Sequence, residues 1–170
     1  MRGMQRARLL FLAKFLGLLI ASYLFVAWQP VNDRVILPFT QWIATTSGFL
    51  LNVLGQEVTA SGTLIRSAQF AVQINNGCNG VEAMLILLAA VVAFPATPRA
   101  KLTGLFLGVI IVQLLNFVRV VTLYLLGAHQ PRLFEIFHTA VWQTVVILTA
   151  IGFFLVWSAR VGPPRVASRA

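Results

Sequence analysis

The 170-residue chain contains one cysteine and four acidic residues, against thirteen lysines and arginines. A single cysteine excludes an internal disulfide framework and any Cys-x-x-Cys metal or redox site. Only 10% of the residues are charged and 59% are hydrophobic, whereas soluble domains carry about 25% charged residues. The formal net charge of +9 does not indicate nucleic-acid binding, which requires a hydrophilic chain with a basic face. The composition therefore excludes an ordinary soluble domain.

Long apolar runs separated by basic residues are present instead, and this pattern is typical of integral membrane proteins. We predict an all-α, polytopic helical bundle that forms one membrane domain over residues 1–170 and is embedded in the lipid bilayer. About four helices are expected to cross a hydrocarbon core roughly 30 Å thick. The predicted spans are residues 9–28, 78–94, 102–126 and 135–157.

The first apolar run follows Arg2, Arg6 and Arg8, an arrangement that resembles a signal peptide. Its length of about 20 residues is sufficient for a transmembrane helix. Trp28, Gln29 and Pro30 follow it, in place of the small residues that a signal-peptide cleavage site requires. We therefore expect a retained anchor with its N-terminus in the cytoplasm.

The distribution of basic residues predicts which loops face the cytoplasm. They concentrate before the first span, in the 95–101 loop and in the tail 158–170, which are all expected to be cytoplasmic. Cytoplasmic termini require an even number of crossings. The ambiguous apolar segment 35–54 is therefore expected to lie at the outer surface or to re-enter the membrane as a helix, not to cross it.

The outer segment 29–77 loses its apolar character after residue 55. Residues 58–65 and 69–74 are rich in Val, Thr, Ile and Phe, the residue types that favour strands. We predict a small extracytoplasmic β-hairpin that leads into the turn at residues 75–80.

Three polar residues are expected at one depth near the outer ends of three spans. A rise of about 1.5 Å per residue places Arg119 about 26 Å, His138 about 28 Å and Cys78 about 24 Å from the cytoplasmic face. Charged residues inside membrane spans cost several kcal/mol, so each is a functional hypothesis. The sequence predicts that a guanidinium, an imidazole and a thiol share one level, and it leaves open whether they touch.

The turn-forming residues Asn75-Asn-Gly-Cys-Asn-Gly80 open a helix, so Cys78 is expected at or near the helix N-terminus. The positive end of a helix dipole and a nearby arginine favour a thiolate, and free N–H groups there can hold an oxyanion. Purely structural roles for these residues are the alternatives. Cys78 could be a small buried hydrophobe, and Arg119 could extend to the membrane surface. Glu82 could pair with Arg119 or cap its own helix, and Asn116 could form an interhelical hydrogen bond.

Three motifs resemble the exosortase/archaeosortase family of polytopic membrane enzymes. They are Asn76-Gly-Cys-Asn-Gly-Val-Glu-Ala83, Asn116-Phe-Val-Arg-Val120 and Phe137-His-Thr139. The family pattern is a Cys-Ser/Asn-Gly motif, an Asn-x-x-Arg motif and a late histidine, and the resemblance covers roughly residues 55–157. The short chain looks most like the exosortase H branch, whose substrates carry an Ile-Pro-Thr-Leu-type signal. Larger family members have additional N-terminal spans, and we expect none of these in this chain.

The resemblance implies a cysteine transpeptidase with Cys78 as nucleophile, His138 as general acid/base and Arg119 stabilising the oxyanion. Asn79, Glu82 and Asn116 are the candidate supporting residues. The implied substrates are secreted proteins with a C-terminal sorting signal made of a short motif, an apolar helix and a basic end. The implied location is the bacterial plasma membrane, with the site on the extracytoplasmic side. The resemblance implies no cofactor.

Two other classes compete with this interpretation. A thiol-dependent membrane acyltransferase would use the same cysteine and histidine on a lipid ester or thioester. A non-enzymatic membrane subunit would explain Arg119 as a packing residue but would leave the 75–80 turn unexplained. Metal catalysis is not expected, because the chain has two histidines and one cysteine and lacks a His-Glu-x-x-His motif.

Overall fold

The computed structural model describes residues 2–161, and the side chains from residue 5 onward. The predicted basic tail 158–170 therefore lies mostly outside the described residues. Nine helical segments follow one another as α1 (Arg2–Ala27), α2 (Gln29–Val31), the π-helix η1 (Asn32–Ile36), α3 (Leu37–Val53), α4 (Val81–Ala93), α5 (Pro98–His129), α6 (Pro131–Ile136), the π-helix η2 (Phe137–Val141) and α7 (Trp142–Val161). Three strands lie between α3 and α4: β1 (Thr59–Ser61), β2 (Leu64–Arg66) and β3 (Ala71–Gln73).

Three continuous helical stretches are long and apolar enough to cross a membrane: Gln5–Ala27, Pro98–His129 and Pro131–Val161. Three of the four predicted spans coincide with them. The fourth, predicted at 78–94, corresponds to α4, which is apolar but has only 13 residues. At about 1.5 Å per residue, α4 is about 20 Å long, shorter than the roughly 30 Å core. The structure thus supports a helical membrane protein with three candidate spans, and a fourth crossing stays a prediction.

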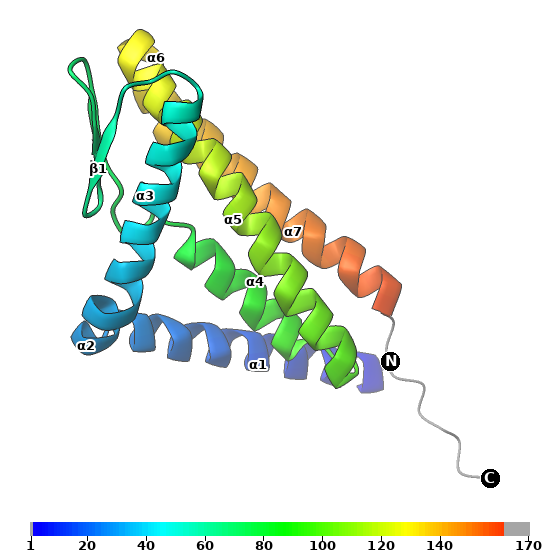
Figure 1. Cartoon of the computed structure of the whole chain (residues 1–170). Coiled ribbons are helices and arrows are strands. Elements are labelled where there is room, and N and C mark those ends of the chain that lie inside the picture. Colours follow the sequence, from blue (N-terminus) through cyan, green and yellow to red (C-terminus); the bar gives the residue numbers. More distant parts are fainter. Residues whose placement is uncertain (1, 162–170) are drawn as a thin grey trace.

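The helices are arranged around α4. Figure 1 shows α1, α3 and α5 as the sides of a triangle, with α4 inside it and α7 alongside α5. Helix α3 corresponds to the ambiguous segment 35–54 and is not among the helices that qualify as membrane-spanning in the described chain. It runs between the C-terminal ends of α1 and α5 (Figure 1), so it connects the ends of two candidate spans.

The predicted β-hairpin is a three-stranded antiparallel sheet with the order β1-β2-β3. The two-strand prediction is wrong because the stretch 58–65 does not form one strand. Gly62 has φ +60° and turns the chain, which places β1 and β2 in antiparallel register with Ser61 opposite Leu64. The inner face of the sheet buries Ile65 against Ile43 of α3 and Tyr124 of α5.

Two glycines on α5 allow close helix packing. A Cβ atom at Gly104 would lie 2.6 Å from the Trp157 ring of α7, and one at Gly108 would lie 2.9 Å from Leu87 of α4. Small residues four positions apart let membrane helices approach closely. These contacts bring α4, α5 and α7 together, and these three helices also lead to the site described below.

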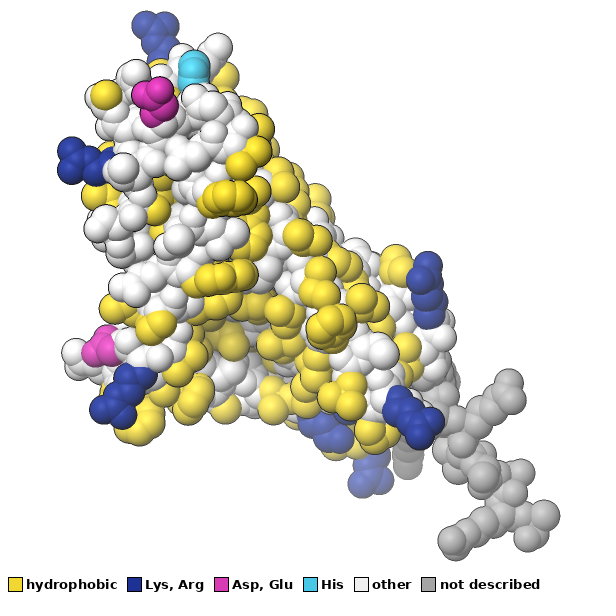
Figure 2. All heavy atoms as spheres, viewed as in Figure 1, with side chains coloured by type: hydrophobic (Ala, Val, Ile, Leu, Met, Phe, Trp, Pro, Cys, Tyr) yellow, Lys and Arg dark blue, Asp and Glu magenta, His cyan; other side chains and the backbone are white. Residues whose placement is uncertain are grey.

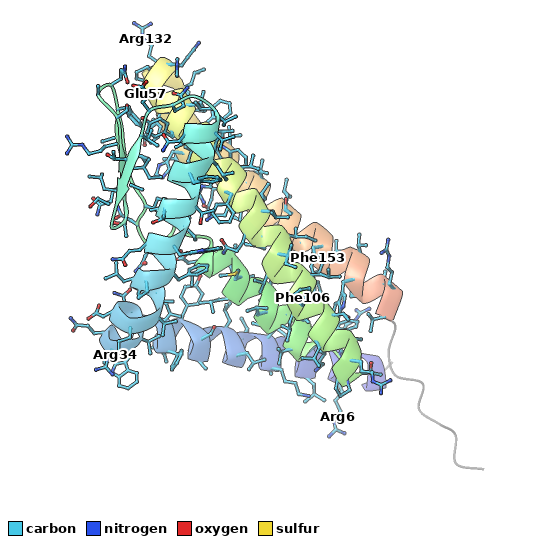
Figure 3. All side chains as sticks on the ribbon, in the orientation of Figure 1. Arg6, Arg34, Glu57, Phe106, Arg132 and Phe153 are labelled. Atoms are coloured by element: carbon cyan, nitrogen blue, oxygen red, sulfur yellow. The ribbon has the colours of Figure 1, made fainter. Side chains whose placement is uncertain are left out.

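Many large apolar side chains remain on the outside, as expected for a protein surrounded by lipid. Phe106 of α5, for example, is 68% exposed. Figure 2 shows hydrophobic side chains over the middle of one face, while the Lys and Arg side chains lie near its edges. Arg6 on α1 and Arg132 on α6 lie at opposite ends of the molecule (Figure 3).

Candidate active site

Cys78 lies in a hydrogen-bonded turn between β3 and α4. Its backbone N–H donates to the Asn75 carbonyl (3.0 Å), and the Gly77 N–H donates to Glu82 Oε1 (2.9 Å). Cys78 lies near the helix N-terminus, as predicted, and α4 itself begins three residues later at Val81. These two N–H groups are occupied by the turn itself, so they do not form the expected oxyanion site.

Gly80 ends the turn and starts α4 in a conformation that other residues rarely adopt. Its φ is +78°, in the left-handed region that glycine reaches at no steric cost. A Cβ atom here would also lie 3.0 Å from Gln113 Nε2 and 3.2 Å from the Asn116 side chain on α5. Glycine therefore lets the turn lie directly against α5.

Asn79 anchors the turn to two neighbouring elements and is fully buried. Its Oδ1 accepts from the Val81 N–H (3.1 Å), which caps α4, and its Nδ2 donates to Thr40 Oγ1 on α3 (2.9 Å). The Asn79 carbonyl accepts from Gln113 Nε2 of α5 (3.4 Å). These bonds connect α3, α4 and α5 around the residue next to Cys78.

His138 approaches Cys78 from the π-helix η2, between α6 and α7. The distance between Cys78 Sγ and His138 Nε2 is 3.2 Å, which is within hydrogen-bond range for sulfur. The imidazole stacks on the Phe134 ring, with centroids 5.6 Å apart and an interplanar angle of 11°. Single-turn π-helical segments occur often at functional sites, but the sequence motifs do not reveal this one. Phe134 was also missed, although its place four residues before His138 puts both on one helical face.

Arg119 reaches the turn from α5 and is 4% exposed. Its Nη2 donates to Cys78 Sγ (3.8 Å) and its Nη1 to the Gly77 carbonyl (3.5 Å). Its Nε is buried without a partner, and no carboxylate pairs with the guanidinium within residues 5–161. Arg119 therefore does not extend to the membrane surface, and part of its donor capacity is unused.

The structure thus brings Cys78, Arg119 and His138 into one cluster, from the turn before α4, from α5 and from η2. A thiol beside an imidazole is the arrangement of an activated sulfur nucleophile. A guanidinium directed at the same sulfur can stabilise negative charge that develops there. Among the described residues, no group of three or more His, Cys, Asp or Glu side chains is placed to hold a metal ion.

The electrostatic environment differs from the one expected at a helix N-terminus. Burial raises the pKa of the Cys78 thiol above its ordinary value, Arg119 lowers it, and the Glu82 carboxylate raises it. The net direction is upward because desolvation disfavours the charged thiolate. Arg119 lowers the thiol pKa as expected, but burial outweighs it, so in the resting site the neutral thiol is favoured.

Two of the candidate supporting residues have unsatisfied polar atoms. Glu82 accepts from the Gly77 N–H with one oxygen, while its other oxygen is buried without a partner among the described residues. Asn116 is 1% exposed, and in the same part of the chain its amide nitrogen and amide oxygen both lack partners. Glu82 therefore holds the turn and does not pair with Arg119. Asn116 packs under Gly80 with its hydrogen-bonding capacity unused.

These features define an integral membrane protein whose single cysteine meets a histidine and a buried arginine where its helices converge. The chain belongs to the transmembrane exosortase family, because the family model for transmembrane exosortases (Exosortase_EpsH) matches residues 1–161. The resemblance of the three motifs is confirmed at the level of the family, and the exosortase H branch stays a prediction. No curated protein and no solved structure matches the chain.

Proposed function

We propose that the protein is a membrane-embedded cysteine transpeptidase that cleaves the C-terminal sorting signal of secreted proteins and transfers them to an acceptor. The observation that carries the proposal is the 3.2 Å contact between Cys78 Sγ and His138 Nε2. Two side chains 60 positions apart meet there at a nucleophile-to-base distance. Membership of the transmembrane exosortase family supports the same reaction class.

The first half of the reaction forms a thioester. As Sγ attacks the scissile carbonyl, its proton passes to His138 Nε2, and negative charge collects on the carbonyl oxygen. Arg119 stabilises this oxygen with a donor that the resting site leaves unused. The carbon–nitrogen bond then breaks, His138 returns the proton to the leaving amine, and the apolar helix of the signal departs.

The second half releases the secreted protein onto its acceptor. A nucleophile with an N–H or O–H group loses a proton to His138 Nε2 and attacks the thioester carbon. The carbon–sulfur bond breaks, and the thiol regains its proton from the imidazole. Because the thiol pKa is raised, Sγ is a poor leaving group as a free thiolate, so the proton that His138 returns assists its departure.

An apolar cavity of about 330 Å³ suits the helical part of the signal. It is lined only by apolar side chains of α1, α4 and α7, such as Phe15, Ile86 and Ile151. Helices α4 and α7 are the elements that follow Cys78 and His138 along the chain. A substrate helix that enters from the bilayer can pack its side chains there.

We place the site on the extracytoplasmic side of the bacterial plasma membrane. The positive-inside rule assigns the ends that carry Arg6, Lys101 and Arg160 to the cytoplasm. Cys78 lies beyond the N-terminal end of α4, at the opposite end of that helix from the 95–101 loop. This side receives the motif of a secreted substrate whose helix is still in the membrane.

The test is co-expression of the protein with a secreted reporter that ends in an Ile-Pro-Thr-Leu-type motif, an apolar helix and a basic end. Wild type is expected to shorten the reporter, while Cys78→Ser at equal expression is not. Mass spectrometry of the peptide that contains Cys78 then identifies the trapped acyl group. A reporter-derived peptide supports the transpeptidase, and a fatty acyl group indicates the acyltransferase instead. Unchanged processing by Cys78→Ser would refute both enzymatic roles.

A further inference from the structure

The edge of the sheet formed by β3 has backbone groups without partners. Ile74 N–H donates to the Thr63 carbonyl (2.9 Å) and Ser67 N–H donates to the Phe70 carbonyl (2.8 Å). Hydrogen-bonded pairs alternate along an antiparallel ladder, and the register pairs Val72 with Ile65. Val72 therefore bonds β2, and the residues on either side of it do not.

It follows that the N–H and carbonyl groups of Ala71 and Gln73 point away from β2. Within residues 2–161 these four groups have no hydrogen-bond partner, and both side chains are exposed. Such an edge is a template for pairing with another extended chain. Proteins commonly protect edges with charged residues or proline, whereas β3 has the sequence Ala-Val-Gln.

This open edge belongs to the strand that leads into the turn with Cys78. Strand β3 ends at Gln73 and the chain continues into the 75–80 turn. Phe70, just before β3, packs edge-on against Phe134 with centroids 5.7 Å apart, and Phe134 in turn stacks on His138. The strand is therefore connected to Cys78 along the chain and to the His138 imidazole through two aromatic rings.

We propose that β3 is the recognition strand for the substrate, which adds its extended motif to the free edge through main-chain hydrogen bonds. This inference rests on the proposed function, and it specifies how the peptide is held. Strand addition obtains affinity from the main chain and specificity from pockets for alternate side chains. The carbonyl and N–H of Gln73 are the groups nearest in sequence to Cys78, so they position the residues next to the scissile bond.

The chemistry also determines the direction of the added strand. The apolar helix of the sorting signal follows the scissile bond and must lie in the bilayer. The part of the substrate outside the membrane therefore precedes that bond. This preceding part is the one that can pair with β3. Because β3 runs towards Cys78, the peptide runs parallel to β3 and delivers its last carbonyl to Sγ.

The test measures alkylation of Cys78 in the full-length protein in lipid vesicles. The probes are biotinylated tetrapeptides of mixed sequence with a C-terminal chloromethyl ketone, and the same mixture with N-methylated backbone amides. Sγ displaces chloride, a carbon–sulfur bond forms, and the thiol proton passes to His138. Wild type is expected to react at least about fivefold faster with the unmethylated mixture, because each methyl group removes one main-chain donor.

Gln73→Pro is expected to abolish this preference, because proline removes an outward N–H and is tolerated on edge strands. Ala60→Pro is the matched control. Ala60 of β1 lies opposite Ile65 of β2, so by the same alternation the Ala60 N–H faces the other edge of the sheet. The Ala60→Pro variant is therefore expected to keep the preference for the unmethylated peptides. Ala71→Pro repeats the test one position further from the turn. Equal rates for the two mixtures in wild type, or a preference that survives both β3 variants, would overturn the proposal.

Iodoacetamide separates this outcome from a failure of the proposed function. Its reaction with Cys78 needs no peptide binding, so equal rates in wild type and the β3 variants show that the cluster is intact. A backbone preference without cleavage of the reporter would contradict only the transpeptidase. Cleavage without a backbone preference would contradict only the recognition strand.

Discussion

Cys78 Sγ and His138 Nε2 lie 3.2 Å apart although 60 positions separate them in the chain. The contact joins a turn before α4 to a π-helical segment before α7. The buried Arg119 of α5 donates to the same sulfur. Neither α4 nor α7 carries the contact within its regular part. The site therefore depends on how the helix ends are held, and the following predictions test that dependence.

Replacement of His138 by Gln is expected to lower the rate of reporter cleavage by about 10²-fold or more, the usual contribution of a general acid–base residue. Glutamine keeps a polar side chain but cannot accept the thiol proton. His129→Gln is the matched control, because this second histidine is exposed, lies outside the cluster and hydrogen-bonds to the Leu125 carbonyl. Equal loss in both variants, measured at equal expression, would contradict a role for His138 in the reaction.

Arg119→Gln is expected to lower cleavage by about 10²- to 10³-fold, as removal of an oxyanion donor does. Arg119→Lys should recover only part of this loss, because a lysine ammonium cannot bond the sulfur and the Gly77 carbonyl with a planar fork. The measurement is the initial rate of reporter shortening. Full activity of the glutamine variant would show that Arg119 only packs against the turn.

The pH dependence of iodoacetamide alkylation reports the thiolate fraction of Cys78. Because burial raises the thiol pKa and Glu82 raises it further, the rate is expected to increase only above the pH at which an ordinary thiol ionises. Glu82→Gln removes a negative charge and should shift the profile to lower pH. Arg119→Gln removes a positive charge and should shift it to higher pH. Shifts of the opposite sign would contradict the electrostatic environment described here.

Gly80→Ala is expected to destabilise the protein by about 1–2 kcal/mol through its left-handed backbone alone. The added Cβ, 3.0 Å from Gln113 Nε2, should also displace the turn and slow alkylation of Cys78. Gly152→Ala in α7 is the control, since no atom lies within 4 Å of its Cβ position and alanine favours a helix by about 0.5–1 kcal/mol. Thermal unfolding in detergent distinguishes the Gly80→Ala variant from the Gly152→Ala variant. Equal unfolding midpoints for the two variants would contradict the constraint at Gly80.

Much of the fold could be predicted from the sequence because the signals are local. Three of the predicted spans coincide with helices that qualify by length and composition, since hydropathy is a property of each run alone. The sheet was predicted as a hairpin because Gly62 was read as part of a strand, whereas its φ of +60° makes it a turn. Such a distinction depends on a single backbone angle that strand propensity does not specify.

The common depth of Cys78, Arg119 and His138 followed from counting residues along each helix, and the structure places the three side chains in contact. The count could not reveal that Cys78 precedes α4 by three residues or that its thiol pKa is raised. The pKa depends on burial by neighbouring helices, which no single motif encodes. Phe134 and Thr40 were missed for the same reason, because their roles exist only through contacts across elements.

The sequence by itself determined that this is a helical membrane protein and which three motifs hold the side chains of the candidate site, because hydrophobicity, charge and motif spacing are properties of the chain itself. Only the tertiary structure decided that these side chains meet. Gly104 and Gly108 allow α4, α5 and α7 to pack closely, and the 75–80 turn and η2 direct Cys78 and His138 towards one another. A contact of 3.2 Å depends on the relative placement of elements far apart in the chain, which local patterns do not determine.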